Sequence, residues 1–188
     1  MRYHRLQLLL SLASAVPAAA RAQDLPSIEI NLRPVFAGPD LALLNTTLRI
    51  SDPSIAAGAN RTLLQFQLGQ HLSPAQRYDG DGLAATDDAG DLPMSYVDDP
   101  SAGRRQWTPG RTPVGDVTVR FSAQPRGKVS GVAGRSDLRL DQGGAVGQGY
   151  SFLPYPPGTR EWNTTVSWTL GDDAPDGTRF ASSLGDSG

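Results

Sequence analysis

An alternation of apolar and polar residues is the dominant pattern along this chain. Five long runs carry an apolar side chain at every second position: residues 28–32, 44–50, 64–68, 117–121 and 162–170. A period of two is typical of β-strands that have one buried face and one wet face. Shorter candidates of the same kind are residues 83–86, 94–97, 105–107, 138–140 and 180–184. Beyond the first 22 residues, no 11-residue window shows a convincing helical period.

Turn-forming residues separate these runs, as in Asp79-Gly80-Asp81-Gly82 and Pro156-Pro157-Gly158. The composition agrees, because the 188 residues include 21 Gly and 15 Pro but only two Glu and one Lys, so that strong helix formers are scarce. Many short strands joined by such turns predict an all-β fold, an antiparallel β-sandwich with long Gly/Pro-rich loops. Residues 123–160 are weakly patterned, and we expect them to cross one end of the sandwich.

Residues 1–22 have the features of a secretory signal peptide. Arg2 and Arg5 give a basic start, an apolar run follows over residues 6–16, and Ala20 and Ala22 supply small residues before a cut after Ala22. We therefore expect a secreted, extracellular protein with a β-sandwich domain at residues 23–185 and a linker-like tail at 186–188. No later segment has the length and apolar character of a membrane span.

Three N-x-Ser/Thr sequons follow the signal, at Asn45, Asn60 and Asn163. Asn45 and Asn163 fall on the polar faces of predicted strands, and Asn60 follows the small loop residues Gly58 and Ala59. A glycan must project into solvent, and all three positions allow this. The sequence therefore predicts a glycoprotein modified at these asparagines.

Charge and cysteine content exclude several classes of function. The whole chain carries a net charge of −2, and without residues 1–22 it has 14 basic and 19 acidic residues, or −5. A mildly acidic domain with scattered arginines lacks the basic stripe that nucleic-acid binding needs, so no nucleic-acid partner is expected. The absence of cysteine excludes disulfides, thiolate zinc sites and cysteine nucleophiles.

The remaining residues give no catalytic or metal constellation. After residue 22, His71 is the only histidine, whereas catalytic zinc sites commonly use two or three. Ser187 lies in a Gly-Asp-Ser-Gly run, but it is one residue from the end and has no base held by an acid. Gly127-Lys128 is not followed by the Ser or Thr of a phosphate loop. We expect no catalytic residue, no metal ligand and no bound cofactor.

Carboxylates are concentrated between residues 79 and 99. Seven aspartates lie there: Asp79, Asp81, Asp87, Asp88, Asp91, Asp98 and Asp99. Clustered carboxylates suit calcium, but no glutamate closes an EF-hand loop. Aspartates also form tight turns by bonding their own backbone, which is the favoured interpretation. Calcium binding stays open as an alternative.

Aromatic residues divide into two groups. Trp162 and Trp168 share the apolar face of a predicted strand, so we expect both in the core. Tyr150, Phe152 and Tyr155 belong to one loop. This loop either forms an exposed contact surface or closes the open end of the sandwich.

An ordered series of segments resembles a known family. The segments are residues 86–93, 105–107, 115–121, 162–170, 175–177 and 182–185. Their spaced tryptophans, turn acids and glycines resemble the N-terminal β-domain of the glycyl-aminopeptidase-like zinc metallopeptidases, which are of the gluzincin type. The resemblance covers most of residues 27–185.

The resemblance implies an all-β domain that precedes a helical zinc domain. The family's H-E-x-x-H zinc motif belongs to that later domain and does not occur in this chain, so no catalytic residue is carried over. The implied function is a non-catalytic module that docks on a peptidase domain missing from this chain, or shapes its cleft. The alternative is a free-standing extracellular module that binds protein or carbohydrate through residues 143–160 or 79–99.

Overall fold

The computed structural model describes residues 25–51, 61–70, 73–74, 82–127, 138–141, 144–158 and 161–181. Within these ranges the regular secondary structure is almost entirely β. The elements in chain order are β1 (Ser27–Ala37), β2 (Asp40–Ser51), β3 (Leu64–Gln67), β4 (Gly69–Gln70), β5 (Ser73–Pro74), β6 (Leu83–Asp87), β7 (Gly90–Asp91), β8 (Met94–Asp99), β9 (Arg104–Pro109), β10 (Val117–Ala123), β11 (Arg139–Asp141), β12 (Gly144–Val146), the 3₁₀ turn Gly149–Ser151 and β13 (Asn163–Trp168).

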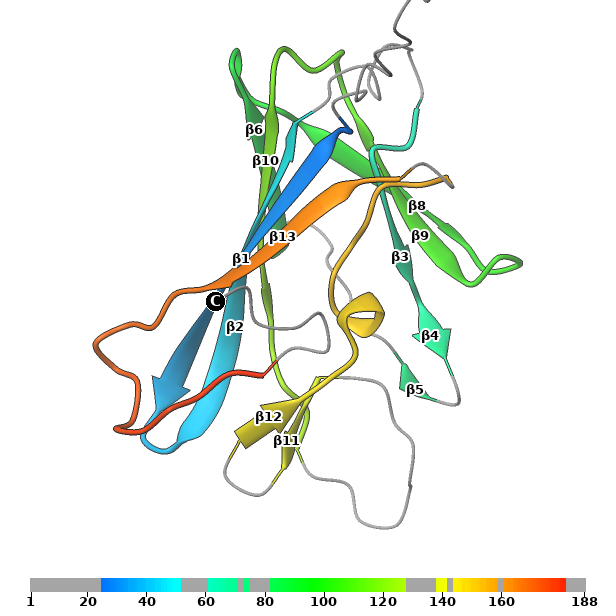
Figure 1. Cartoon of the computed structure of the whole chain (residues 1–188). Helices are drawn as coiled ribbons and strands as arrows, with labels where there is room; N and C mark the ends of the chain where they lie inside the picture. Colours follow the sequence, from blue (N-terminus) through cyan, green and yellow to red (C-terminus); the bar gives the residue numbers. More distant parts are fainter. Residues whose placement is uncertain are drawn as a thin grey trace, which may run out of the picture.

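Two sheets of unequal size form the sandwich. The larger has six strands in the order β13-β1-β2-β10-β6-β7, and the smaller has three in the order β3-β9-β8. Figure 1 shows the smaller sheet beside one end of the larger one. The predicted all-β sandwich is confirmed, and no helix in the described ranges is long and apolar enough to cross a membrane.

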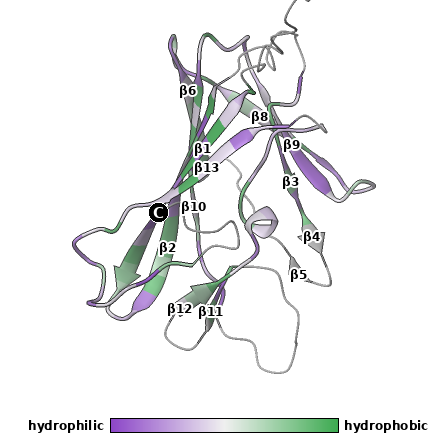
Figure 2. Ribbon diagram, in the orientation of Figure 1, coloured by the Kyte–Doolittle hydropathy of each residue, from purple (hydrophilic) through white to green (hydrophobic). Residues whose placement is uncertain are grey.

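The alternation seen in the sequence sets the inner face of the larger sheet. Leu48 on β2 lies opposite Val119 on β10, and both are buried, whereas the neighbouring Arg49 and Arg120 point to the other face and are exposed. Figure 2 shows hydrophobic stretches along β1 and β2 and a hydrophilic end on the β8–β9 hairpin. Apolar burial on one face is therefore what fixes the register of this sheet.

The smaller sheet contributes the largest aromatic side chains of the core. Phe66 on β3 and Trp107 on β9 are almost wholly buried, and their rings meet edge to face with centroids 6.4 Å apart. They belong to the same buried cluster as Leu48 and Val119 of the opposite sheet. A single core thus joins the two layers, as a sandwich requires.

Three expectations need correction. The sheets are not antiparallel throughout, because β13 pairs in parallel with β1, from Ser27 opposite Asn163 to Leu32 opposite Trp168. Residues 180–181 are not strand, and Phe180 instead stacks on Trp168. Trp168 is 36% exposed rather than a core residue, because it ends an edge strand with no further strand beside it in the described sheet.

The weakly patterned region 123–160 contains more structure than expected. Its described part forms the β11–β12 hairpin and the 3₁₀ turn, and backbone hydrogen bonds join Arg126 to Leu138 and Leu140. The strands of the smaller sheet have four to six residues, whereas β1 has 11 and β2 has 12. Figure 1 shows this hairpin beside the end of β2 that the smaller sheet does not reach.

Candidate functional site: an apolar cavity beside the short sheet

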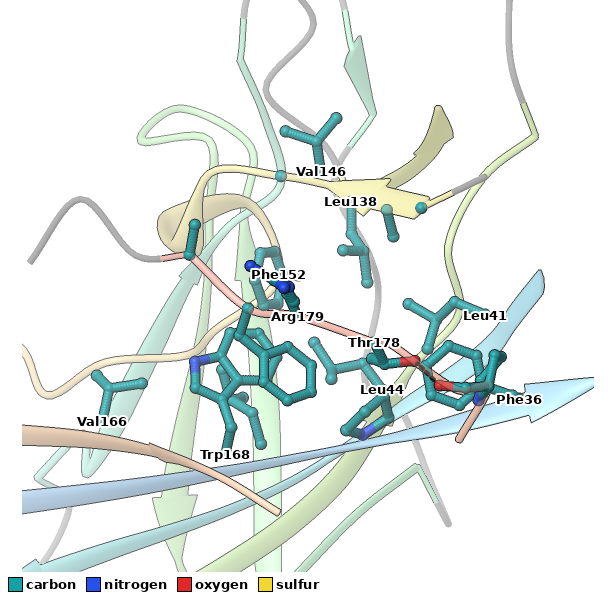
Figure 3. A pocket seen from close by; sticks show the side chains of 18 of the residues that line it. Phe36, Leu41, Leu44, Leu138, Val146, Phe152, Val166, Trp168, Thr178 and Arg179 are labelled. Carbon is teal, nitrogen blue, oxygen red and sulfur yellow. Dashed lines mark hydrogen bonds between the residues drawn. The ribbon is translucent and has the colours of Figure 1, made fainter. Parts of the chain in front are cut away.

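A cavity of about 730 Å³ lies where the larger sheet extends past the smaller one. Three segments line it: the inner face of β1, β2 and β13, the β11–β12 hairpin with the 3₁₀ turn, and residues 175–181. Figure 3 shows their side chains around this space. The cavity follows directly from the unequal lengths of the two sheets, because a hairpin and a loop replace strands there.

A β-bulge shapes the sheet wall. The β1–β2 register shifts between Val35 and Phe36, so Ala42 has no partner and Leu41 pairs with Phe36. The extra residue turns Leu41 toward the same side as Leu44, and Phe36 lines the cavity with both. The bulge therefore directs Leu41 toward the cavity, whereas Phe36 lies on that side by regular alternation with Leu32 and Pro34.

The two arms of the hairpin wall approach each other closely where Gly147, after β12, faces Leu138, before β11. A Cβ atom added there would lie 2.8 Å from the Cα atom of Leu138. This contact is too short for any residue with a side chain, so glycine lets the two segments come together. Phe152 follows on the same wall and is 6% exposed.

Residues 171–181, which we call the strap, form the third wall. Asp173 fixes its beginning, because its carboxylate accepts a 2.7 Å hydrogen bond from the backbone N–H of Phe36. Phe180 fixes its far end by stacking on Trp168, with ring centroids 4.3 Å apart and planes 7° apart. The strap thus leaves the end of β13 and returns to it.

Two charged residues of the strap, Asp176 and Arg179, also line the cavity. In the close view Arg179 lies in the region between Phe152 and Trp168 (Figure 3). Among the described residues no ion pair joins Arg179 to a carboxylate, and the other lining side chains are almost all apolar. Arg179 is therefore a cation at the edge of an apolar space.

Two apolar side chains that line this cavity, and a third two residues beyond its lining, are exposed to solvent. Val146 is 50% exposed, Trp168 is 36% exposed and Leu170, two residues after Trp168, is 47% exposed. We call these three residues the apolar rim. Grouped exposed apolar side chains mark surfaces that bind other molecules.

The predicted contact loop is only partly at the surface. Phe152 is a core residue, so the expectation that it contacts a partner is corrected. Tyr155 is half-buried and exchanges backbone hydrogen bonds of 2.7 and 2.9 Å with Gln65, and the hydroxyl of the half-buried Tyr150 donates to Gln148. The loop therefore pairs with the edge strand β3 at Gln65, and a contact role for Tyr150 and Tyr155 stays a prediction.

Two of the three sequon asparagines lie in described strands. Asn45 points to the outer face of the larger sheet, where its side-chain oxygen accepts a 2.6 Å hydrogen bond from the Ser122 hydroxyl. This bond leaves the amide nitrogen, the atom that carries a glycan, available. Asn163 is exposed on the edge strand β13, and Asn60 lies outside the described residues. Glycosylation itself stays a prediction.

Asp87, Asp98 and Asp99 have side-chain hydrogen bonds within the fold. Asp87 accepts hydrogen bonds from the Arg111 guanidinium and from the backbone N–H groups of Ala89 and Val114, and these donors hold the pKa of its carboxyl far below the usual range. Asp98 binds Arg105, with one of its two contacts at 2.8 Å. These are the structural roles expected of turn acids.

Asp99 closes the β8–β9 turn. Its carboxylate accepts hydrogen bonds from the hydroxyl and backbone N–H of Ser101 and from the N–H of Ala102, which lower its pKa. In the part of the chain that the structure describes, no three His, Cys, Asp or Glu side chains come together as a metal site. Asp79, Asp81, His71 and Ser187 lie outside those ranges.

Sequence comparisons give no assignment: no family model and no curated protein matches this chain. One solved structure, an aminopeptidase N family protein from Idiomarina loihiensis, aligns with 79% of this chain and with 23% of its own length. The two are 17% identical, and the TM-score is 0.49. This chain thus spans about a quarter of that protein, and a similarity of this size assigns no function.

Proposed function

We propose that this chain is a secreted, glycosylated and non-catalytic module that docks on a zinc-peptidase domain of the glycyl-aminopeptidase-like type. The observation that carries the proposal is the apolar rim of Val146, Trp168 and Leu170. These side chains are exposed to water, two of them in the lining of the cavity, and burial against an apolar patch of a partner domain favours association. The partner is a catalytic domain that the printed sequence does not include.

The residues that resemble the peptidase family support a framework role. Trp107 is in the core, Asp87 binds Arg111 at a loop, and Trp168 holds the strap through Phe180. None of these contacts holds a reacting group. A resemblance carried by framework residues is what a shared module would produce, since the family's zinc chemistry lies in a different domain.

The positions of two sequons agree with docking through the inner side of the larger sheet. Asn45 and Asn163 both belong to the outer face of the larger sheet, whereas the cavity and Trp168 of the rim lie on the inner side. Glycans on the outer face would discourage contact there by their bulk and hydration. Docking is therefore expected through the inner side.

Binding to a separately expressed gluzincin-type peptidase domain, measured by biolayer interferometry, tests the docking role. Serine at Trp168 and at Leu170 removes apolar area from the rim, and each change should weaken binding by about tenfold. Val97→Ser is the matched control, because Val97 is 70% exposed but belongs to the smaller sheet. The proposal fails if the three variants bind equally, or if the wild-type chain does not bind.

An activity assay tests the non-catalytic part of the proposal. The purified chain is incubated with aminoacyl p-nitroanilides, with and without added zinc. We expect no release of nitroaniline in either condition. Zinc-dependent turnover that co-purifies with the chain would overturn this part and leave the docking measurement unaffected.

A free-standing binding module is the second candidate. The observation that favours it is that residues 144–149 of the predicted binding loop line the cavity, so a ligand there would touch this loop. Ligand binding without any peptidase domain distinguishes this candidate from the first. The contact residues would then be those of the hairpin wall rather than Tyr150 and Tyr155.

A further inference from the structure

We propose that the cavity binds a single-chain alkyl carboxylate of medium length, with the hydrocarbon inside and the carboxylate on Arg179. This inference goes beyond docking, because it needs no partner protein and assigns a ligand class to the cavity itself. It rests on three features of the described residues: the size of the cavity, its apolar walls and one unpaired cation at its edge.

The size and the walls suit a hydrocarbon chain. At about 730 Å³ the cavity lies within the range of small-molecule sites, roughly 300–1,000 Å³. Its walls carry aliphatic and aromatic side chains from three separate segments, represented by Leu41, Phe152 and Phe180. These apolar side chains offer dispersion contacts along a hydrocarbon chain.

The head group follows from Arg179. A guanidinium stays charged and presents donors in a planar fork that matches a carboxylate. No carboxylate within the described ranges pairs with Arg179, and it lies among the apolar lining residues in Figure 3. Asp176, three residues earlier on the strap, also lines the cavity and would repel a second negative charge, so we infer one carboxylate and not two.

Trp168 reports on this site, because it lines the cavity and is stacked on Phe180 of the strap. Bromine quenches indole fluorescence on contact. The probes are 11-bromoundecanoate and 11-bromoundecanol, which share the chain and the bromine but differ in charge. Both are titrated below their critical micelle concentration while tryptophan emission is recorded.

We expect saturable quenching by 11-bromoundecanoate and binding about tenfold weaker for 11-bromoundecanol. Trp168→Phe should remove most of the quenching. Arg179→Gln should reduce the preference for the carboxylate at least fivefold, whereas Arg120→Gln, on the opposite face of the larger sheet, should leave it unchanged.

Unbrominated carboxylates, used as competitors, should bind about fourfold more tightly for each added methylene up to undecanoate.

A cavity-filling variant provides a second test. Ala145→Phe places a ring in the lining without adding a tryptophan, and it should weaken both probes by a similar factor. Circular dichroism checks that each variant is folded. If Ala145→Phe does not fold, the comparison of Arg179→Gln with Arg120→Gln decides whether the inference holds. The inference is overturned if neither probe quenches saturably, or if Arg179→Gln and Arg120→Gln keep the same preference. Either result leaves the rim-docking measurement untouched.

Discussion

The two tryptophans Trp107 and Trp168 give the sharpest test of the packing. Both stand on strands and both belong to apolar positions, yet Trp107 is 2% exposed and Trp168 is 36% exposed. Replacing each in turn by alanine removes the same side chain from two different environments. The account predicts a large loss of stability for Trp107→Ala and a small one for Trp168→Ala.

The magnitudes follow from the contacts. Trp107 fills the core against Phe66, so its removal leaves a cavity and should cost about 3–5 kcal/mol of unfolding free energy. Trp168 is partly in water already and loses mainly its stack on Phe180, which points to about 1–2 kcal/mol. The expected difference between the variants is therefore about 2–3 kcal/mol.

Urea unfolding followed by far-ultraviolet circular dichroism measures both losses. With a denaturant slope of about 2 kcal/mol per molar urea, the midpoint should fall by about 2 M for Trp107→Ala and by about 0.5–1 M for Trp168→Ala. Equal slopes for the three proteins would show that the comparison is of stability alone. If Trp168→Ala costs as much as Trp107→Ala, the placement of Trp107 in the core and of Trp168 at its edge is wrong.

Three further predictions concern the framework and the surface. Asp87→Asn should lower the urea midpoint at pH 7. The pKa of Asp87 is depressed in the folded state, so the carboxylate contributes its full stability above the ordinary aspartate pKa of about 4. The difference in midpoint between wild type and variant should therefore shrink as the pH falls below that value. Gly115→Ala should lower the unfolding free energy, measured by thermal unfolding, by at least about 1–2 kcal/mol. The φ angle of Gly115 is +68°, and a Cβ atom there would lie 1.9 Å from a carboxylate oxygen of Asp88. Gly82→Ala is the control and should be near neutral, because the space around Gly82 is open. Peptide-N-glycosidase should increase the gel mobility of the chain secreted from a glycosylating host, and Asn45→Gln and Asn163→Gln should each remove one step; unchanged mobility of the wild type would contradict the glycoprotein prediction.

Period-two runs allowed most of the strands to be predicted from the sequence. Residues 44–50 and 117–121 alternate cleanly because β2 and β10 each have one face in the core and one in solvent. Turn acids were recognisable in part, since Asp87 and Asp99 each accept a hydrogen bond from the backbone N–H two residues on, although the main partner of Asp87 is the distant Arg111. Patterns of this kind are local, so a single sequence reports them well.

The cavity and its walls are not local and were missed. It depends on the short length of β3, β8 and β9, on the bulge beside Phe36 and on the return of Phe180 to Trp168. The parallel pairing of β1 with β13 joins residues far apart in the chain, and alternation gives no strand direction. The sequence also predicted Trp168 in the core. Periodicity identifies the apolar face of a strand, but it does not tell whether a second layer covers that face.

Hydrogen exchange of the chain, alone and mixed with a gluzincin-type peptidase domain, tests the docking role most directly. The account predicts that amides of residues 144–149 and 163–170, which surround the apolar rim, become protected in the mixture. Protection confined to the β8–β9 hairpin or the outer face of the larger sheet, or no protection anywhere, would contradict it.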